Sequence, residues 1–314
     1  MELHVWEGDS SYGLPSMDLE SLQIMMYVKF SGAPVKIIKS MSPAHAPSRN
    51  LPVLSCPSGN LNKFSAITAH LRRKNFSCDH ELTRKQCSDV LAYQQLIEEK
   101  LFPAFVYLWW VEPRSYQEII HKWYYSRMRF PYKLWVPSNR HNAYKAFIES
   151  IVDEPDDEVA VETELLKRGQ ECLTLLSVRL GDKGFFFGSS PSSLDAILAP
   201  YLALLLKVDL RVPALQNHLR QCPNLTAYVS RALATCFPNE NPSSIGYGRD
   251  KPRGPPPAED GVNKTSLIFF TLAAALANFG YVFASGLVRV DSGDVSDDGE
   301  EYGLAEEEEE EQHE

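Results

Sequence analysis

The chain has 314 residues, of which 44% are hydrophobic and 23% are charged, so it is long and apolar enough to form one or two packed domains. Its net charge of −10 is concentrated at one end, because residues 291–314 hold thirteen acidic residues and no Lys or Arg, which leaves +3 for residues 1–290. A body this close to neutral gives no indication of nucleic-acid binding.

Residues 1–79 have the pattern of a small α/β unit. Leu3 and Val5 alternate with polar neighbours and predict a short first strand. Ser16 is a candidate N-cap for a helix that runs to Phe30, with Leu19, Leu22 and Met26 on the same apolar face. The other expected elements are strands at 35–38 and 51–56 and a helix at 64–73.

From residue 80 to residue 237 the apolar positions recur at helical spacing. One long helix is expected over 82–110, kinked near Pro103, whose ring removes a backbone donor. Leu101–Val111 is apolar almost all round and too short to cross a bilayer, which favours a buried helix. The aromatic residues in 102–110 and 123–125 are candidate interface anchors, with ordinary core as the simpler interpretation. Further helices are expected at 115–128, 140–152, 158–180, 192–208, 213–221 and 224–236.

The stretch before the 192–208 helix predicts a capping box. Ser192 stands at the helix start and Asp195 follows three residues later, where its carboxylate reaches back to the cap. Pro191 keeps the chain from entering as helix. A catalytic carboxylate is the alternative, but the neighbours of Asp195 are apolar and offer no polar partner.

The six cysteines include no C-x-x-C pair, and no histidines complete a zinc pattern. Neither a metal site nor a cofactor is predicted, and the cysteines are expected to be reduced. No Lys or Arg precedes Lys29, so neither a mitochondrial presequence nor a secretory signal is expected at the N-terminus.

The C-terminal part predicts a membrane tail anchor. Residues 238–264 are rich in Pro and Gly and form a candidate linker. Residues 265–288 contain no charge and reach about 36 Å as a helix, enough for a hydrocarbon core of about 30 Å. Lys264 and Arg289 flank this span and are expected to lie at the two membrane–water interfaces. Residues 289–314 are expected to be a disordered acidic tail. A buried C-terminal helix is the alternative.

An α/β unit followed by an all-helical unit is similar to the glutathione transferase architecture, with a thioredoxin-like N-terminal domain. Pro52 resembles the family's proline, usually cis, before the third strand, and Ser65 resembles the serine that holds a peptide carboxylate at a helix N-terminus. Ser11 and Tyr12 lie where the family places its thiolate-stabilising hydroxyl, but they match no active-site signature. We expect these four residues to mark a vestigial groove, with no catalytic residue.

A closer resemblance is to the metaxin family. It is carried in order by YGLPSMDLESL, KFSGAPVKI, HLRRKNFSCDHELTRKQ, LIEEKLFP, ECLTLLSVRLG and FFFGSSPSSLDAILAPYLALLL. The predicted span favours the anchored type of family member, and Ser189 departs from the Asp usual after FFFG. The resemblance implies a non-enzymatic accessory subunit of the sorting and assembly machinery, which inserts β-barrel precursors into the mitochondrial outer membrane.

The implied location is tail-anchored in that membrane, with the N-terminal domains facing the cytosol. The implied partners are a metaxin-2-like subunit, the β-barrel core subunit of the machinery, β-barrel precursors and outer-membrane lipid. Two alternatives remain open at this point. One is a membrane-tethered glutathione-dependent transferase; the other is an adaptor that links mitochondria to kinesin-based transport.

Overall fold

The computed structural model describes residues 1–152 and 157–238, which belong to one compact unit. A four-stranded sheet has the order β2-β1-β3-β4. β1 (Glu2–Trp6) pairs in parallel with β2 (Lys36–Ser40), and β3 (Val53–Cys56) pairs antiparallel with both β1 and β4 (Gly59–Leu61). The three predicted strands are present. β4 was not predicted, because three residues are too few to show a period of two.

Two helices cover the sheet, α1 (Leu19–Phe30) and α2 (Phe64–Arg73), and α2 has the predicted bounds. The N-cap of α1 is Asp18, so the expectation of Ser16 was wrong. Asp18 Oδ2 accepts from the Ser21 amide at 2.9 Å, whereas Ser16 Oγ accepts from the Asp18 amide at 3.1 Å. A carboxylate is the stronger acceptor at a helix start, and Ser16 supports the turn before it.

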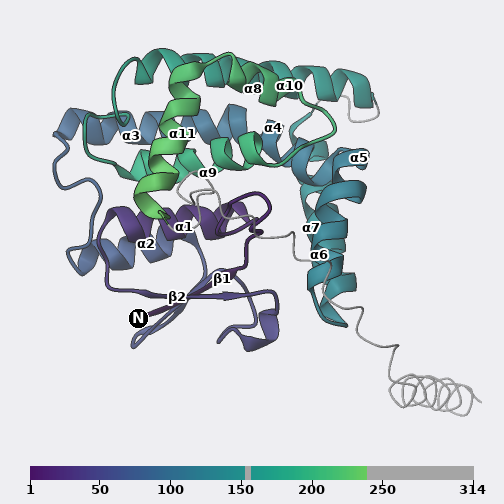
Figure 1. Ribbon diagram of the computed structural model, residues 1–314, viewed down its shortest axis with the longest axis horizontal. Helices are drawn as coiled ribbons and strands as arrows, with labels where there is room; N and C mark the ends of the chain where they lie inside the picture. The colour runs from purple at the N-terminus through teal and green to yellow at the C-terminus, as the bar shows by residue number, and fades with distance from the viewer. Residues whose placement is uncertain (153–156, 239–314) are drawn as a thin grey trace, which may run out of the picture. The chain divides into compact units, whose positions relative to one another are not determined.

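α1 is buried on all sides rather than on one face. Residues 21–28 are all buried, because α1 lies between the sheet and α9 (Ser193–Lys207). Figure 1 shows this order of layers, from the sheet through α1 to α9 and then to the outer helices. α9 is itself buried from Ser193 to Leu205, as expected of a central helix. The two helices thus lie at the centre of the contact between the α/β part and the helical part.

The long helix after the sheet continues through Pro103. It consists of α3 (Arg84–Leu96), the π-helical turn η2 (Ile97–Leu101), α4 (Phe102–Val106) and a second π-helical turn η3 (Tyr107–Val111). Pro103 stands in the first turn of α4, so the wider turn before it accommodates the missing donor. The last helix of the α/β part, α2, ends at Arg73, and the long helix begins at Arg84. A domain boundary at residues 79 and 80 stays a prediction.

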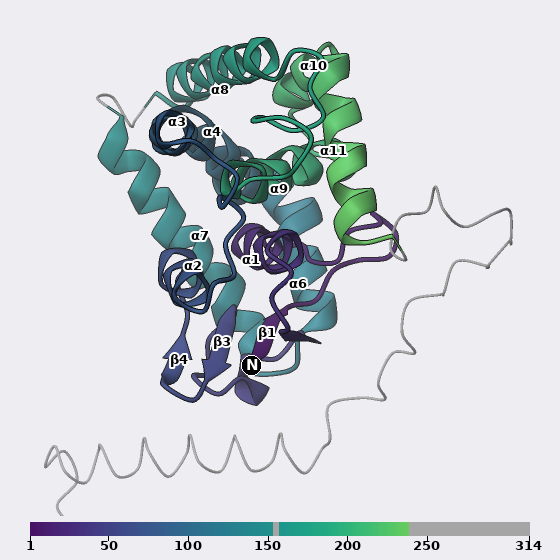
Figure 2. The same ribbon diagram turned by 90° about the vertical axis from the view of Figure 1, so that its left-hand side faces the viewer.

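The remaining helices are η1 (Pro43–His45), α5 (Pro113–Ser115), η4 (Tyr116–His121), α6 (Lys122–Arg127), α7 (Tyr132–Ile151), α8 (Glu158–Leu180), α10 (Ala214–Arg220) and α11 (Pro223–Cys236). They match the predicted ones within a few residues, with two exceptions: α7 begins at Tyr132 rather than at residue 140, and η1 was not predicted. Figure 2 shows α8 and α10 on the side of this unit away from the sheet.

The aromatic segments proposed as interface anchors are mostly core. Every residue from Pro103 to Trp110 is buried, as are Trp123 and Tyr124, and only Tyr125 is exposed. Burial therefore excludes the interpretation as interface anchors for all of them except Phe102, which is half-buried, and Tyr125.

Within residues 1–152 and 157–238, no helix has both the length and the hydrophobicity needed to cross a bilayer. The predicted span at 265–288, its flanks Lys264 and Arg289, most of the linker and the acidic tail lie outside the described residues.

Candidate functional site

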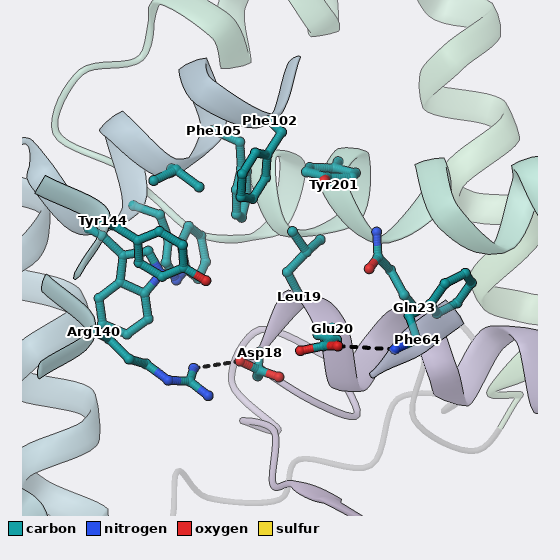
Figure 3. Close-up of a pocket in the computed structure, with 13 residues that line it drawn as sticks. Asp18, Leu19, Glu20, Gln23, Phe64, Phe102, Phe105, Arg140, Tyr144 and Tyr201 are labelled. Atoms are coloured by element: carbon teal, nitrogen blue, oxygen red, sulfur yellow. Dashed lines mark hydrogen bonds and ion pairs between the residues drawn. The ribbon is translucent and has the colours of Figure 1, made fainter. Parts of the chain in front are cut away.

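A pocket of about 300 Å³ lies where α1, the start of α2, the α4–η3 segment, α7 and α9 meet. Figure 3 shows that α1 contributes polar side chains on one side, while aromatic side chains from the helical part form the other. The polar set comprises Asp18, Glu20 and Gln23 from α1 and Arg140 from α7. The pocket is therefore built by both parts of the fold.

The aromatic wall is held by ring contacts among its own members. Phe105 stacks on Trp109 with ring centroids 5.2 Å apart and meets Tyr201 edge-on at 5.3 Å. Trp110 stacks on Tyr144 of α7 at 5.7 Å. Because each ring is fixed by another, the wall is preorganised and apolar.

Arg140 ties α7 to the start of α1. Its Nη1 donates to Asp18 Oδ1 at 2.6 Å and to the Tyr124 hydroxyl at 3.3 Å. The guanidinium also lies 5.2 Å from the ring centre of Trp6 and 5.6 Å from that of Trp110. Burial opposes the charge on Arg140, but the Asp18 carboxylate outweighs it and raises the pKa of the guanidinium. The charge of Asp18 is thus already neutralised within the chain.

Glu20 closes the N-terminus of α2. Its Oε1 accepts from the backbone amide of Phe64 at 3.2 Å, and Lys63 at the N-cap position supplies no side-chain cap. Burial raises the pKa of Glu20, and the neighbouring Asp18 carboxylate raises it further, while the Phe64 hydrogen bond opposes both. An anionic ligand that approached this helix end would meet a carboxylate already in place.

The four predicted groove residues do not line the pocket. Ser11 is exposed, and its amide and hydroxyl both donate to Asp9 Oδ1, at 2.9 and 2.7 Å. Tyr12 is half-buried, and this burial raises the pKa of its hydroxyl. The nearby negative charge of Asp9 raises that pKa further.

Pro52 follows a cis peptide bond, and the Leu51 carbonyl accepts from the Trp6 indole at 3.0 Å. Ser65 is exposed on α2, and its carbonyl accepts from the Thr68 hydroxyl at 3.1 Å. A ligand-binding role for Ser11, Tyr12, Pro52 and Ser65 stays a prediction.

Asp195 and Ser192 lie together at the start of α9. Asp195 Oδ2 accepts from the amide of Ser192 at 2.7 Å and from its hydroxyl at 2.6 Å, and Oδ1 accepts from the Phe186 amide at 3.2 Å. Burial raises the pKa of Asp195, although these hydrogen bonds act to lower it. The carboxylate joins the helix start to the preceding loop and lies outside the pocket.

Asp18, Glu20 and Arg140 were not identified from the sequence. The first two fall in the opening turn of a helix, where acidic residues are common for dipole reasons alone. Arg140 lies 122 residues after Asp18, and no local pattern joins residues so far apart. The useful signal would have been an arginine on the half-buried face of a helix.

Two family models match the chain. The model described as "Outer mitochondrial membrane transport complex protein" matches residues 21–141, and the one for the glutathione S-transferase C-terminal domain matches residues 169–232. Among curated proteins, metaxin-1 of Macaca fascicularis is 39% identical over 92% of both chains, and metaxin-1 of Bos taurus is 38% identical over 99% of both. Metaxin-3 of Xenopus laevis is 33% identical over 80% of this chain and 81% of its own.

Among solved structures, a glutathione S-transferase of Ceriporiopsis subvermispora in complex with glutathione covers 75% of this chain and 95% of its own, at 13% identity and a TM-score of 0.47. The apo form of glutathione S-transferase III covers 82% of this chain and 100% of its own, at 12% identity and a TM-score of 0.48. The transferase-like fold rests on the C-terminal family model together with the α/β part followed by a helical part.

Proposed function

The chain belongs to the metaxin family, and from that premise we propose that it is a non-enzymatic accessory subunit of the mitochondrial outer-membrane sorting and assembly machinery. In this role it supports the import and insertion of β-barrel precursor proteins. The observation that carries the proposal is identity of 38–39% to metaxin-1 chains over 92–99% of the sequence. The family model over residues 21–141 points to an outer mitochondrial membrane transport complex.

The proposed partners are a metaxin-2-like subunit, the β-barrel core subunit and the precursors themselves. The proposed attachment is a tail anchor at residues 265–288, which leaves the α/β part and the helical part in the cytosol. The sequence supports this arrangement through 24 residues without charge between Lys264 and Arg289.

Two contacts of the pocket support a role without glutathione chemistry. The Glu20 carboxylate already accepts a hydrogen bond from the Phe64 amide at the start of α2, and Arg140 already pairs with Asp18. A peptide carboxylate would have to displace the first contact and compete for the second, and each displacement leaves a buried charge without its partner. The pocket is thus better suited to holding the two parts of the fold together than to turning over an anionic peptide.

The decisive experiment is native-gel separation of mild-detergent extracts of mitochondria that contain the tagged full chain. We expect comigration with the β-barrel insertase and slowed assembly of imported porin after depletion of the chain. Release of the chain by alkaline carbonate, as readily as a soluble protein, would overturn the anchor. Migration of the chain apart from the insertase would overturn the assignment to the machinery.

The two alternatives give different readouts. Glutathione conjugation by the purified full chain, lost on changing Ser65 or Tyr12, would establish the transferase. Arrested movement of mitochondria with normal porin assembly would establish the transport adaptor.

A further inference from the structure

One segment of the helical part is strongly basic. Between Glu118 and Glu149 the chain carries six Lys and Arg residues and no acidic residue. Three of the six pair with carboxylates. Among the residues that the structure describes, the other three, Lys122, Arg129 and Lys133, form no ion pair with a carboxylate. Their charge is available to an external partner.

Large apolar side chains protrude from the same segment. Tyr125 is 43% exposed, Phe130 55%, Leu134 46% and Trp135 63%. The other four tryptophans of the chain are each at most 8% exposed. An exposed tryptophan that follows an exposed leucine in the chain is costly in water unless a partner covers both.

The cations and the apolar side chains come from one continuous segment, residues 122–135, which comprises α6, the 128–131 turn and the first turn of α7. Lys133 Nζ lies 4.6 Å from the ring centre of Tyr125, which brings α7 against the end of α6. The Lys133 amide donates to the Arg129 carbonyl at 3.2 Å, which places these two residues one turn apart. Figures 1 and 2 show this turn on the sheet side of the unit, away from α8.

We propose that this α6–α7 surface, comprising Lys122, Tyr125, Arg129, Lys133, Leu134 and Trp135, docks on an anionic lipid bilayer. Trp and Tyr are the side chains that favour the headgroup level of a membrane, and Lys and Arg are attracted by anionic lipid. The contact goes beyond the proposed function and rests on it only in that the chain works beside a membrane. It would fix the orientation of the folded body relative to the bilayer, which an anchor on a long linker does not.

A bilayer fits the surface better than the chain's own acidic segment does. Residues 291–314 carry thirteen acidic residues and match the cations, but they contain neither Trp nor Phe and few other large apolar side chains. That segment would leave the exposed side chains of Tyr125, Leu134 and Trp135 in water. The interfacial region of an anionic bilayer accommodates both the charges and the rings.

The test uses the full chain reconstituted in vesicles of phosphatidylcholine with brominated acyl chains, with or without phosphatidylserine. Bromine quenches tryptophan on contact, residues 265–288 contain no Trp, and Trp135 is the exposed one of the five. We expect quenching in vesicles that contain phosphatidylserine, little in neutral vesicles, and its loss in Trp135→Phe. High salt should reduce it, because screening weakens exposed charges.

The informative variant combines Lys122→Glu, Arg129→Glu and Lys133→Glu. Each cation near an anionic surface contributes about fivefold to binding, so the docked population should fall relative to the undocked one by at least about 100-fold. The matched control is Lys85→Glu, Lys167→Glu and Lys183→Glu, three exposed cations outside this segment, with the same change in charge and no expected loss of quenching.

Quenching that is equal in neutral vesicles, survives Trp135→Phe or is unaffected by the triple variant would overturn the proposal. So would a change in Trp135 emission on removal of residues 291–314, without quenching by lipid, since the acidic segment would then be the occupant. Comigration with the insertase on native gels is measured separately, so failure of docking and failure of the proposed function are distinguishable.

Discussion

Arg140 on α7 donates a 2.6 Å hydrogen bond to Asp18, the residue that caps α1. The same carboxylate accepts from the Ser21 amide through its other oxygen at 2.9 Å. One side chain therefore both starts the central helix of the α/β part and holds the helical part against it. The pocket between them depends on this contact.

Arg140→Met is expected to lower the free energy of unfolding by about 3 kcal/mol, because it leaves the Asp18 carboxylate without its cation. The measurement is urea unfolding of the full chain in detergent, with Lys145→Met as the exposed control on α7. Adding Asp18→Asn should recover part of the loss, since Asn also caps helices and carries no charge. A loss no larger than that of the control would contradict the role assigned to this pair.

Glu20→Gln is expected to raise stability at pH 7 relative to the parent chain. The folded state raises the pKa of Glu20 above its ordinary 4.5, so the native chain binds more protons there than the unfolded chain does. Stability contributed by this group is present below about pH 4.5 and is lost as the pH rises through the folded-state pKa. The Gln variant removes this loss and keeps an acceptor for the Phe64 amide.

Unfolding curves between pH 4 and pH 8 would check this, with Glu99→Gln as the exposed control. The parent and Glu20→Gln curves should converge at low pH and separate as the pH rises. Parallel curves at all pH values would show that Glu20 is not perturbed in the folded chain.

Asp195→Ala is expected to destabilise the chain by about 3 kcal/mol, because it leaves the buried amides of Ser192 and Phe186 without an acceptor. Asp195→Asn, which retains one acceptor oxygen, should cost less. Asp182→Ala, at an exposed position, provides the baseline. Equal effects of the Ala and Asn variants would mean that the hydrogen bonds contribute little.

Gly169→Val is expected to destabilise the chain by about 2 kcal/mol or more through overpacking. A β-carbon at this position of α8 would lie 2.9 Å from the Ala104 β-carbon and 2.9 Å from a Leu215 methyl group, so both neighbours would have to move. Ala143→Val, on the exposed face of α7, shows what a valine costs a helix without overpacking, about 0.5 kcal/mol. Gly169→Val should cost more than this control, although valine has a higher helix propensity than glycine. Thermal unfolding of the two variants side by side gives the comparison.

The secondary structure was predictable where neighbouring residues alone determine both the type and the ends of an element. The helix at Phe64–Arg73 has both an apolar stripe and a basic last turn, and its bounds came out as predicted. The Ser192–Asp195 contact follows from a three-residue spacing that chemistry fixes. The N-cap of α1 was missed because Ser16 and Asp18 are both good caps, and only the position of the preceding turn decides between them.

The pocket was not predictable, because its chemistry comes from segments far apart in the chain. Glu20 meets Phe64 across 44 residues, and Arg140 meets Asp18 across 122. No periodicity reports such a pairing. The exposed Trp135 and the buried Trp109 and Trp110 are equally apolar in the sequence, so only burial in the fold separates core from surface.

The burial of residues 21–28 of α1 has an evolutionary corollary. A helix with one solvent-exposed face tolerates substitution at every third or fourth residue, where a side chain points into water. Residues 21–28 offer no such position, because all of them are buried. A saturation mutagenesis scan of the gene would find that none of those eight consecutive codons tolerates most substitutions. Diversification among descendants of this sequence would have to proceed through the outer helices instead.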